Sequence, residues 1–249
     1  MTTTLAGRTV AIIGASRGLG RGAAEAFAHC GATVLAMARD RIALEDLAAK
    51  NPTVRPIAAD ATTSESPGLI ITEHQPDVLI LVAGATPPIG PLRGMSWKDF
   101  SAAWETDVRL THLWLSAALN EPLRPGSRVV VISSGAGFAG SPLSGGYSGA
   151  KAMQRFMASD AQVESDADGL GITFTAVLPT LTPLTAVGAV GAEAHAAVAG
   201  ISVAEFTDQL GDSLTPETFG SALIDLASRP ATDVEGSFRL TAAGLSKLP

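Results

Sequence analysis

The sequence predicts an α/β fold in which helices cover both faces of a parallel β-sheet. Short apolar runs alternate with segments whose apolar residues recur at helical spacing, and the alternation continues through all 249 residues. Such alternation is typical of right-handed βαβ crossovers, which place helices on both faces of a parallel sheet. Because no internal repeat or linker is evident, we expect one domain over residues 1–249.

Seven apolar runs have the length and composition of strands. They cover residues 9–13, 33–38, 54–59, 78–82, 128–132, 172–178 and 237–241. Pro56 lacks an N–H group, which is tolerated at the edge of a sheet, so 54–59 is expected to be an edge strand.

Helices are predicted between these strands, where apolar residues recur every three or four positions. They cover residues 19–30, 41–50, 62–73, 96–119, 147–168 and 215–226. Asp40 is expected to cap the second helix, and Ser96 opens a capping-box pattern for the fourth. Pro67-Gly68 weakens the prediction at 62–73.

The composition excludes several classes of protein. A net charge of −7 without a basic run argues against a nucleic-acid partner. The uncharged stretches 129–150 and 172–192 are broken by Gly, Pro, Ser or Thr, so no membrane partner is expected. Cys30 is the only cysteine, which excludes an internal disulfide and a multi-cysteine metal site; we expect no metal. The first five residues lack the pattern of a secretory signal, and a cytoplasmic location is expected.

A glycine-rich turn follows the first predicted strand and opens the first predicted helix. Its spacing is G-x-x-x-G-x-G, which permits a tight turn and close approach of a pyrophosphate to a helix N-terminus. Many such turns are only turns, but the strand-turn-helix context favours a nucleotide site. The candidate cofactor-binding residues are Gly14, Ser16, Arg17, Gly18, Leu19 and Gly20.

Two arginines indicate which dinucleotide binds. An acidic residue at the end of the second strand would bind the ribose diol of NAD, but Arg39 stands there and Asp40 is assigned to capping. Arg17 and Arg39 match a 2′-phosphate, so NADP(H) is predicted; alternatively, both are solvated surface charges. Asp60, followed by Ala61, could accept from the adenine amino group or could be a turn residue.

Tyr147 is the only tyrosine, and its neighbours suggest proton transfer. Lys151 follows at the fourth position, and Ser134 lies thirteen positions before. The phenol would be the acid or base, the ammonium would favour the phenolate, and the serine would hold a substrate oxygen. Alternatively, Tyr147 and Lys151 are ordinary neighbours on a helix surface.

Together these residues resemble the short-chain dehydrogenase/reductase family in its small single-domain form. The residues that carry the resemblance are Gly14-x-x-x-Gly18-x-Gly20, Asp60, Ala83-Gly84, Ser134 and Tyr147-x-x-x-Lys151. The resemblance covers nearly the whole chain. It implies a three-layer, Rossmann-like, doubly wound sheet of about seven strands, with hydride transfer between a nicotinamide and a carbonyl or alcohol. It also implies a homodimer or homotetramer, one interface of which would pair helices 96–119 and 147–168.

The resemblance assigns roles to particular residues. Tyr147 would donate the proton, Lys151 would also bind the nicotinamide ribose, and Ser134 rather than Ser133 fits the spacing. Further candidates for cofactor contacts are Ala83, Gly84, Pro179 and Thr182, with Thr185 nearby.

Three departures from the family pattern concern the site. Leu81-Val82 replaces a common pair of asparagines, and Pro179-Thr180 replaces a common Pro-Gly. Asp107 stands where the family often has an asparagine in a proton relay, and an ionised carboxylate cannot donate a hydrogen bond. Asp107 is therefore a fourth candidate catalytic residue.

The sequence thus predicts an NADP(H)-dependent oxidoreductase acting on a carbonyl or secondary alcohol, a ketone reductase among the options. Residues 181–214 are rich in Ala, Val, Gly and Thr and are expected to form an apolar substrate lid, or else simply a packed helix. The second hypothesis, motivated by the departures, is a cofactor-binding sensor or scaffold with little turnover. His112 and His195 have no partner spacing that demands a catalytic role.

Overall fold

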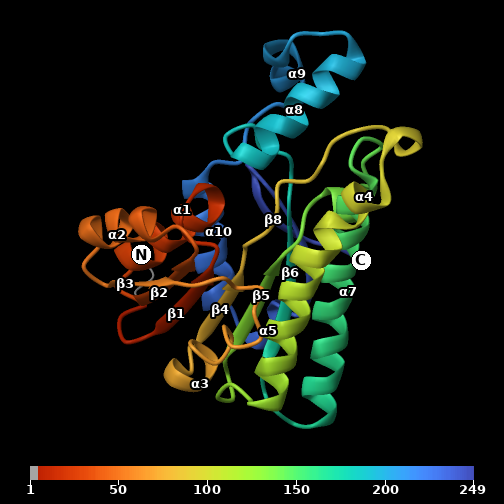
Figure 1. The fold of residues 1–249 in the computed structure, drawn as a ribbon. Helices are drawn as coiled ribbons and strands as arrows, with labels where there is room; N and C mark the ends of the chain where they lie inside the picture. Colours follow the sequence, from red (N-terminus) through yellow and green to blue (C-terminus); the bar gives the residue numbers. More distant parts are fainter. Residues whose placement is uncertain (1–4) are drawn as a thin grey trace.

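The computed structural model describes residues 5–249 as an eight-stranded sheet between helices (Figure 1). The strand order is β3 (Val54–Ala58), β2 (Thr33–Ala38), β1 (Thr9–Ile13), β4 (Val78–Leu81), β5 (Arg128–Ile132), β6 (Thr173–Pro179), β7 (Gly236–Thr241) and β8 (Gly244–Lys247). All neighbouring pairs are parallel except β7 and β8. The predicted parallel α/β sheet is confirmed, with β3 at one edge.

The direction of winding reverses between β1 and β4. From β1 the chain adds β2 and β3 on one side, and from β4 it adds β5 to β7 on the other. In open α/β sheets, ligands bind beyond the carboxyl ends of the strands at such a reversal. Gly14 and Val82 are the residues that follow these two strands.

Two apolar cores lie on opposite faces of the sheet. Val10 and Ile12 of β1 point into one core and Ala11 and Ile13 into the other, because successive side chains of a strand alternate. The first core is covered by α1 (Gly18–His29), α2 (Arg41–Lys50) and α10 (Pro216–Ser228). The second is covered chiefly by α5 (Arg109–Asn120) and α7 (Gly145–Ala167). These layers are visible in Figure 1.

The helix predicted at 96–119 forms three consecutive pieces. Ser96 caps α4 (Trp97–Ala103), accepting from the Asp99 N–H at 3.2 Å as the capping pattern indicates. A π-helical turn, η2 (Trp104–Val108), then precedes α5. Such turns are rare and are frequent at functional sites. Asp107 lies in this turn.

Several other elements differ from the sequence-based expectation. The helix predicted over 62–73 is wrong for most of its length, because turns precede the single helical turn α3 (Ile71–His74). Pro67 accounts for part of this difference, because proline has no backbone N–H to donate to a helical hydrogen bond. The sequence also missed β8 and three short helices: α6 (Ala136–Ala139), η1 (Leu92–Gly94) and η3 (Ala231–Asp233).

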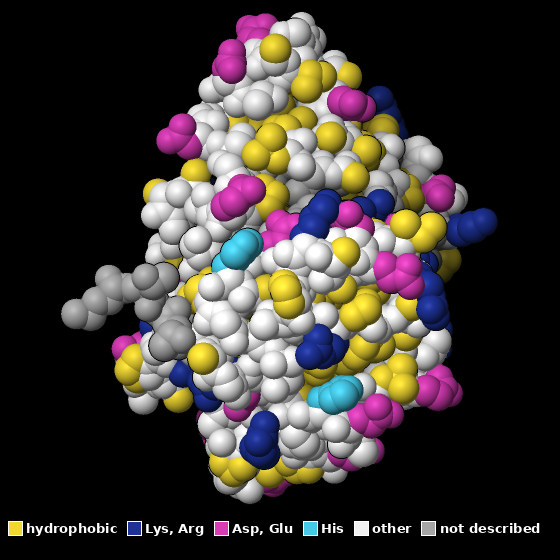
Figure 2. Space-filling model, turned by 90° about the vertical axis from the view of Figure 1, so that its left-hand side faces the viewer, with side chains coloured by type: hydrophobic (Ala, Val, Ile, Leu, Met, Phe, Trp, Pro, Cys, Tyr) yellow, Lys and Arg dark blue, Asp and Glu magenta, His cyan; other side chains and the backbone are white. Residues whose placement is uncertain are grey.

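Residues 181–214 project from the body of the molecule as two helices, α8 (Ala186–Ala199) and α9 (Val203–Leu210) (Figure 1). His195 stacks on Phe206, with ring centroids 5.9 Å apart, and so joins the two helices. Figure 2 shows hydrophobic side chains spread over this projecting segment. Its exposed residues include Leu184, Val198 and Leu210.

No single helix within residues 5–249 has the length and apolar character needed to cross a membrane. Helices α8 and α9 together pass that test by length and composition only, and they meet at a bend of 106°.

Candidate active site

The glycine turn lies against the segment that follows β4. Gly14 has a φ of +107°, and a Cβ there would lie 2.6 Å from the backbone N of Ala83. A Cβ at Gly20 would lie 2.1 Å from the Gly14 carbonyl oxygen. Side chains at these two positions would therefore clash with backbone that cannot easily move. The glycines bring the two strand ends together at the reversal of the sheet.

Helix α1 begins inside this turn. Its N-cap, Arg17, makes no capping hydrogen bond with its side chain. The first N–H groups of a helix lack intrahelical partners and, with the helix dipole, favour an anion. The predicted residues Ser16, Arg17, Gly18 and Leu19 thus surround a helix N-terminus suited to a phosphate.

Arg17 and Arg39 are both exposed at the carboxyl ends of the strands. Neither guanidinium has a hydrogen bond or ion pair with another residue in the 5–249 region. Asp40 accepts from the Ala43 N–H at 3.0 Å, which confirms that it caps α2. The acidic residue nearest the end of β2 is therefore already used within the fold.

Asp60 forms a turn after β3. Its Oδ1 accepts from the Thr62 N–H at 2.9 Å and from the Thr62 hydroxyl at 2.8 Å. The pKa of Asp60 is lowered by the backbone hydrogen bond, then by the hydroxyl, with smaller effects from the charges of Arg39 and Arg109. The carbonyl of Ala61 accepts from the Trp114 indole at 2.9 Å. The structure shows Asp60 in a turn, and its contact with the adenine amino group stays a prediction.

Tyr147 and Lys151 lie on successive turns at the start of α7. Gly146 lets this helix approach α4 closely, since a Cβ there would lie 1.9 Å from the Phe100 carbonyl oxygen. The Lys151 Nζ atom lies 5.5 Å from the centroid of the Tyr147 ring. Tyr147 is half-buried, whereas Lys151 is only 5% exposed. The pair is therefore not an exposed surface pair.

The Lys151 ammonium is enclosed by oxygen atoms from three elements. It donates to Gln154 Oε1 at 2.8 Å and to the Ile132 carbonyl at 3.3 Å. Asp107 Oδ2 lies 3.0 Å away as an ion pair. Burial alone would lower the pKa of Lys151, but the charges of Asp107 and Tyr147 outweigh that effect and raise it.

Asp107 is fully buried and connects the lysine to the glycine turn. Its Oδ1 accepts from the Ala85 N–H at 2.9 Å and from the Thr106 hydroxyl at 3.0 Å. A Cβ at Gly84 would lie 3.0 Å from Oδ2. Among residues 5–249, Oδ2 has no partner with full hydrogen-bond geometry, and Lys151 meets it as a close ion pair. The structure thus places Asp107 in contact with the lysine and against the Ala83-Gly84 segment.

The two serines after β5 have different roles. The Ser133 hydroxyl is buried and donates to the Lys151 carbonyl at 2.6 Å, which ties β5 to α7. Ser134 is half-buried, and its oxygen accepts from the Ala136 N–H at 3.2 Å. The Ser134 hydrogen has no acceptor among the residues the structure describes. The Ser134 hydroxyl therefore retains an unused donor.

The start of the 181–214 segment lies beside the glycine turn. A Cβ at Gly18 would be 3.5 Å from the Thr185 methyl group. Pro179, the last residue of β6, accepts from the Gly135 N–H at 2.8 Å. The buried Thr182 hydroxyl donates to the Leu214 carbonyl at 2.7 Å and so joins the two ends of the segment. That hydroxyl is thus engaged within the fold.

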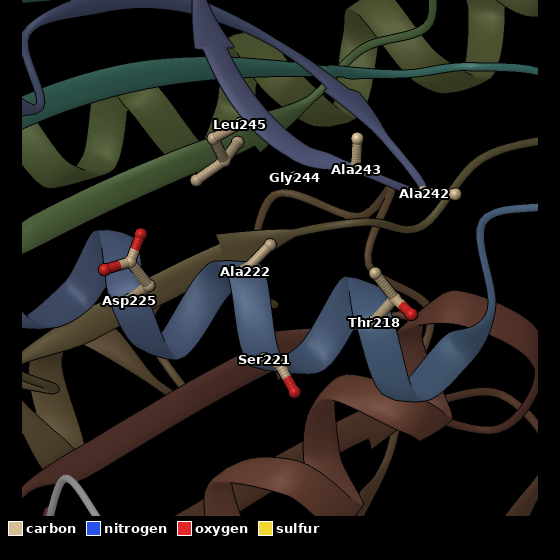
Figure 3. Close-up of a pocket in the computed structure, with 8 residues that line it drawn as sticks. All are labelled: Thr218, Ser221, Ala222, Asp225, Ala242, Ala243, Gly244 and Leu245. Atoms are coloured by element: carbon tan, nitrogen blue, oxygen red, sulfur yellow. The ribbon is translucent and has the colours of Figure 1, made fainter. Parts of the chain in front are cut away.

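One hollow lies away from these residues. It has a volume of about 280 Å³ and lies between α10 and the β7–β8 turn (Figure 3). Its lining residues are Thr218, Ser221, Ala222, Asp225, Ala242, Ala243, Gly244 and Leu245. None of these was singled out by the sequence. Within residues 5–249, no three His, Cys, Asp or Glu side chains are placed to bind a metal.

The strand order, with the glycine turn at its reversal, defines an α/β fold of the dinucleotide-binding kind. The chain matches the family model described as short chain dehydrogenase over residues 8–194, and it belongs to this family of oxidoreductases. The resemblance found in the sequence is thereby confirmed. Members of the family use nicotinamide cofactors in general.

Two relatives have recognisable similarity. Human L-xylulose reductase is 28% identical over 109 residues, which cover 44% of this chain and 45% of the human protein. A short chain dehydrogenase of Pseudocercospora fijiensis is 28% identical over 189 residues, which cover 70% of this chain and 60% of the fungal protein. The matched regions therefore span less than two thirds of either relative.

Proposed function

We propose that the protein is an NADP(H)-dependent oxidoreductase that transfers hydride between the nicotinamide and a carbonyl or secondary alcohol. The observation that carries the proposal is the buried Lys151 ammonium, 5.5 Å from the ring of Tyr147. A positive charge so close to a phenol favours the phenolate, which a proton donor must become when it gives up its proton.

The residues present suit a nicotinamide dinucleotide. Gly14 and Gly20 let the turn pack closely at positions where a side chain would clash with backbone. The side chain of the N-cap, Arg17, does not cap α1, so the first N–H groups of the helix can bind a phosphate. Lys151 has three N–H donors, and two of them are engaged in hydrogen bonds to protein carbonyl oxygens. The third is the donor that a ribose hydroxyl would share with the Asp107 carboxylate. When bound, the nicotinamide supplies the hydride for reduction or accepts it for oxidation.

The protein's own residues handle the proton. In reduction, Tyr147 gives its phenolic proton to the substrate oxygen, and the Lys151 charge stabilises the phenolate that remains. Ser134 donates a hydrogen bond to the same oxygen and helps to orient the carbonyl. Asp107 balances the lysine charge and keeps the ammonium buried.

The preference for NADP(H) rests on Arg17 and Arg39. Within residues 5–249 both are exposed guanidinium groups without a hydrogen bond or ion pair, at the strand ends where a 2′-phosphate would be bound. Asp40 does not compete for a ribose diol, because its carboxylate caps α2.

The substrate class is inferred from the lid. The exposed surface of α8 and α9 is largely apolar, which favours an apolar ketone or cyclic alcohol over a polyol. The name of the human relative, L-xylulose reductase, indicates a sugar substrate for that protein. The two possibilities can be separated by experiment.

A homodimer or homotetramer is proposed on separate grounds. Phe156 and Val163 on α7 are 60% and 66% exposed, and Trp97 at the start of α4 is exposed too. Apolar side chains of this size at neighbouring helices are typical of an interface between subunits.

The test is oxidation of NADPH by the purified protein with a panel of ketones, including cyclic and β-keto compounds, beside L-xylulose. Turnover with apolar ketones at a higher kcat/KM than with the sugar is expected. Faster reduction of the sugar would contradict the substrate class. Binding of NADPH without turnover of any carbonyl would favour the sensor or scaffold hypothesis.

A further inference from the structure

Gln154 is buried one helical turn after Lys151, and the mechanism above does not use it. Its side chain has no exposure to solvent. A buried amide is costly unless its oxygen and nitrogen are both hydrogen-bonded. Residues three apart on a helix lie on the same face, so Gln154 and Lys151 are neighbours on one face of α7.

Both ends of this amide are fully used. Gln154 Oε1 accepts from Lys151 Nζ at 2.8 Å. Gln154 Nε2 donates to the Asp107 carbonyl at 3.2 Å and to the Thr111 hydroxyl at 2.7 Å. The Thr111 hydroxyl in turn donates to the Asp107 carbonyl at 2.8 Å. Gln154 therefore links the lysine on α7 to the π-helical turn and to α5.

Among the contacts of the ammonium, the one with Gln154 is the shortest hydrogen bond. The bond to the Ile132 carbonyl is longer, at 3.3 Å. The Asp107 contact, at 3.0 Å, falls outside hydrogen-bond geometry and leaves Oδ2 without such a partner in the part of the chain that the structure describes. A charged donor beside a buried, unpartnered carboxylate oxygen would turn toward it if nothing held it back.

We infer that Gln154 is a positioning residue of the Tyr147 site, which holds the Lys151 ammonium away from full pairing with Asp107. Held in this way, the ammonium keeps part of its charge directed at Tyr147. The titratable groups that face the ammonium are Asp107 from the π-helical turn and Tyr147 from α7. The effect of this arrangement on catalysis rests on the proposed function. The position of the Lys151 ammonium relative to Asp107 and Tyr147 does not.

Because Tyr147 is the only tyrosine, its ionisation can be followed directly by the ultraviolet absorbance of the phenolate, without substrate or cofactor. In Gln154→Met the ammonium should pair fully with Asp107, so phenolate should form at a pH higher by roughly half a unit or more. In Asp107→Asn the carboxylate is absent, so adding Gln154→Met should produce little or no such shift. The dependence on Asp107 distinguishes positioning from general damage.

Gln162→Met is the matched control. Gln162 lies on the same helix, and its amide binds Asp166 and the Phe174 N–H, away from the lysine. Its loss should change the unfolding temperature but leave the Tyr147 titration unchanged. If Gln154→Met does not fold, Gln154→Leu also removes the acceptor for Lys151, and it should move phenolate formation to higher pH only where Asp107 is present.

An unchanged titration in Gln154→Met, or a shift to lower pH, would overturn the inference. So would a shift of the same size in the Asp107→Asn background. Where NADPH turnover is measurable, we expect kcat at neutral pH to fall about threefold or more, with little change in KM for the carbonyl. Absence of turnover in the wild type would count against the proposed function but would leave the titration result intact.

Discussion

The ion pair between Asp107 and Lys151 leads to a quantitative prediction about Asp107→Asn. Both side chains are buried, and the charged atoms are 3.0 Å apart. Two unit charges at this distance attract by about 5 kcal/mol at an effective dielectric constant of about 20. Removing one member of a buried pair typically costs about 3–5 kcal/mol. Asparagine keeps an oxygen for the Ala85 N–H and the Thr106 hydroxyl, so we expect a loss near 3 kcal/mol, at the low end of that range.

The dependence of this loss on pH follows from Lys151. Its pKa in the folded protein is raised above the ordinary value of 10.5. The lysine therefore stabilises the wild type fully below pH 10.5, and this contribution disappears as the pH rises through the folded value. In Asp107→Asn, burial without a counter-charge should lower the pKa instead. The difference in stability between the two proteins should thus be largest near neutral pH and should narrow as the pH rises.

Urea unfolding of the wild type and Asp107→Asn, from neutral pH upward, measures the difference in their free energies of unfolding. Asp160→Asn is the control, because Asp160 is an exposed carboxylate on α7 and its loss should change stability by less than about half a kcal/mol. A loss below about 1 kcal/mol at neutral pH, or a difference that widens with pH, would refute the reasoning from the ion pair.

Three further predictions concern the cofactor and the substrate. Arg39→Asp should weaken NADPH binding at least tenfold more than NADH binding, because it removes a partner of the 2′-phosphate and adds a like charge. Gly14→Ala should abolish binding of either dinucleotide, measured by nucleotide fluorescence, because the new Cβ would displace Ala83. Ser134→Ala should lower kcat/KM by roughly tenfold to a hundredfold, whereas Ser133→Ala should act mainly on stability, by about 1–2 kcal/mol.

Matched controls exist for the cofactor variants. Arg41→Asp changes an exposed arginine on α2 and should leave the NADPH-to-NADH ratio unchanged. Gly94→Ala adds a Cβ where no atom of residues 5–249 lies within 4 Å, so binding should persist. Equal weakening of both dinucleotides in Arg39→Asp would argue against the 2′-phosphate role. Normal binding by Gly14→Ala would show that the turn does not hold the cofactor.

The sequence predicted seven of the strands because each is a short apolar run bounded by polar or turn residues. It missed β8, where Gly244–Lys247 has only one large apolar residue and depends on pairing with β7. The helix predicted over 62–73 failed because its few apolar residues give little periodicity and Pro67-Gly68 interrupts it. The spacing of apolar residues predicts a helix or strand only where it repeats along the segment.

The site residues that could be recognised from the sequence are those that belong to motifs. The glycine turn, Ser134, Tyr147 and Lys151 have fixed spacings that can be read along the chain. Gln154 belongs to no such motif, and its importance depends on which residues of α5 and the π-helical turn face α7. A polar residue on the buried side of a predicted helix, one turn from a candidate lysine, was the only available signal.

The π-helical turn around Asp107 was also beyond the sequence. One extra residue in a helical turn leaves the apolar spacing almost unchanged over a short segment, so the 96–119 segment reads as one continuous helix. The sequence did single out Asp107 as a candidate catalytic residue in place of a common asparagine. The structure shows the contact, with the carboxylate also bound to the Ala85 N–H.

The most direct measurement of the central claim is NADPH oxidation by Tyr147→Phe beside the wild type, with an apolar ketone and with NADPH binding measured separately. Phenylalanine keeps the ring and removes the proton donor. We predict NADPH binding within about threefold of the wild type and a fall in kcat of roughly a hundredfold or more. Undiminished turnover in the variant would contradict the assignment of Tyr147 as the acid and base.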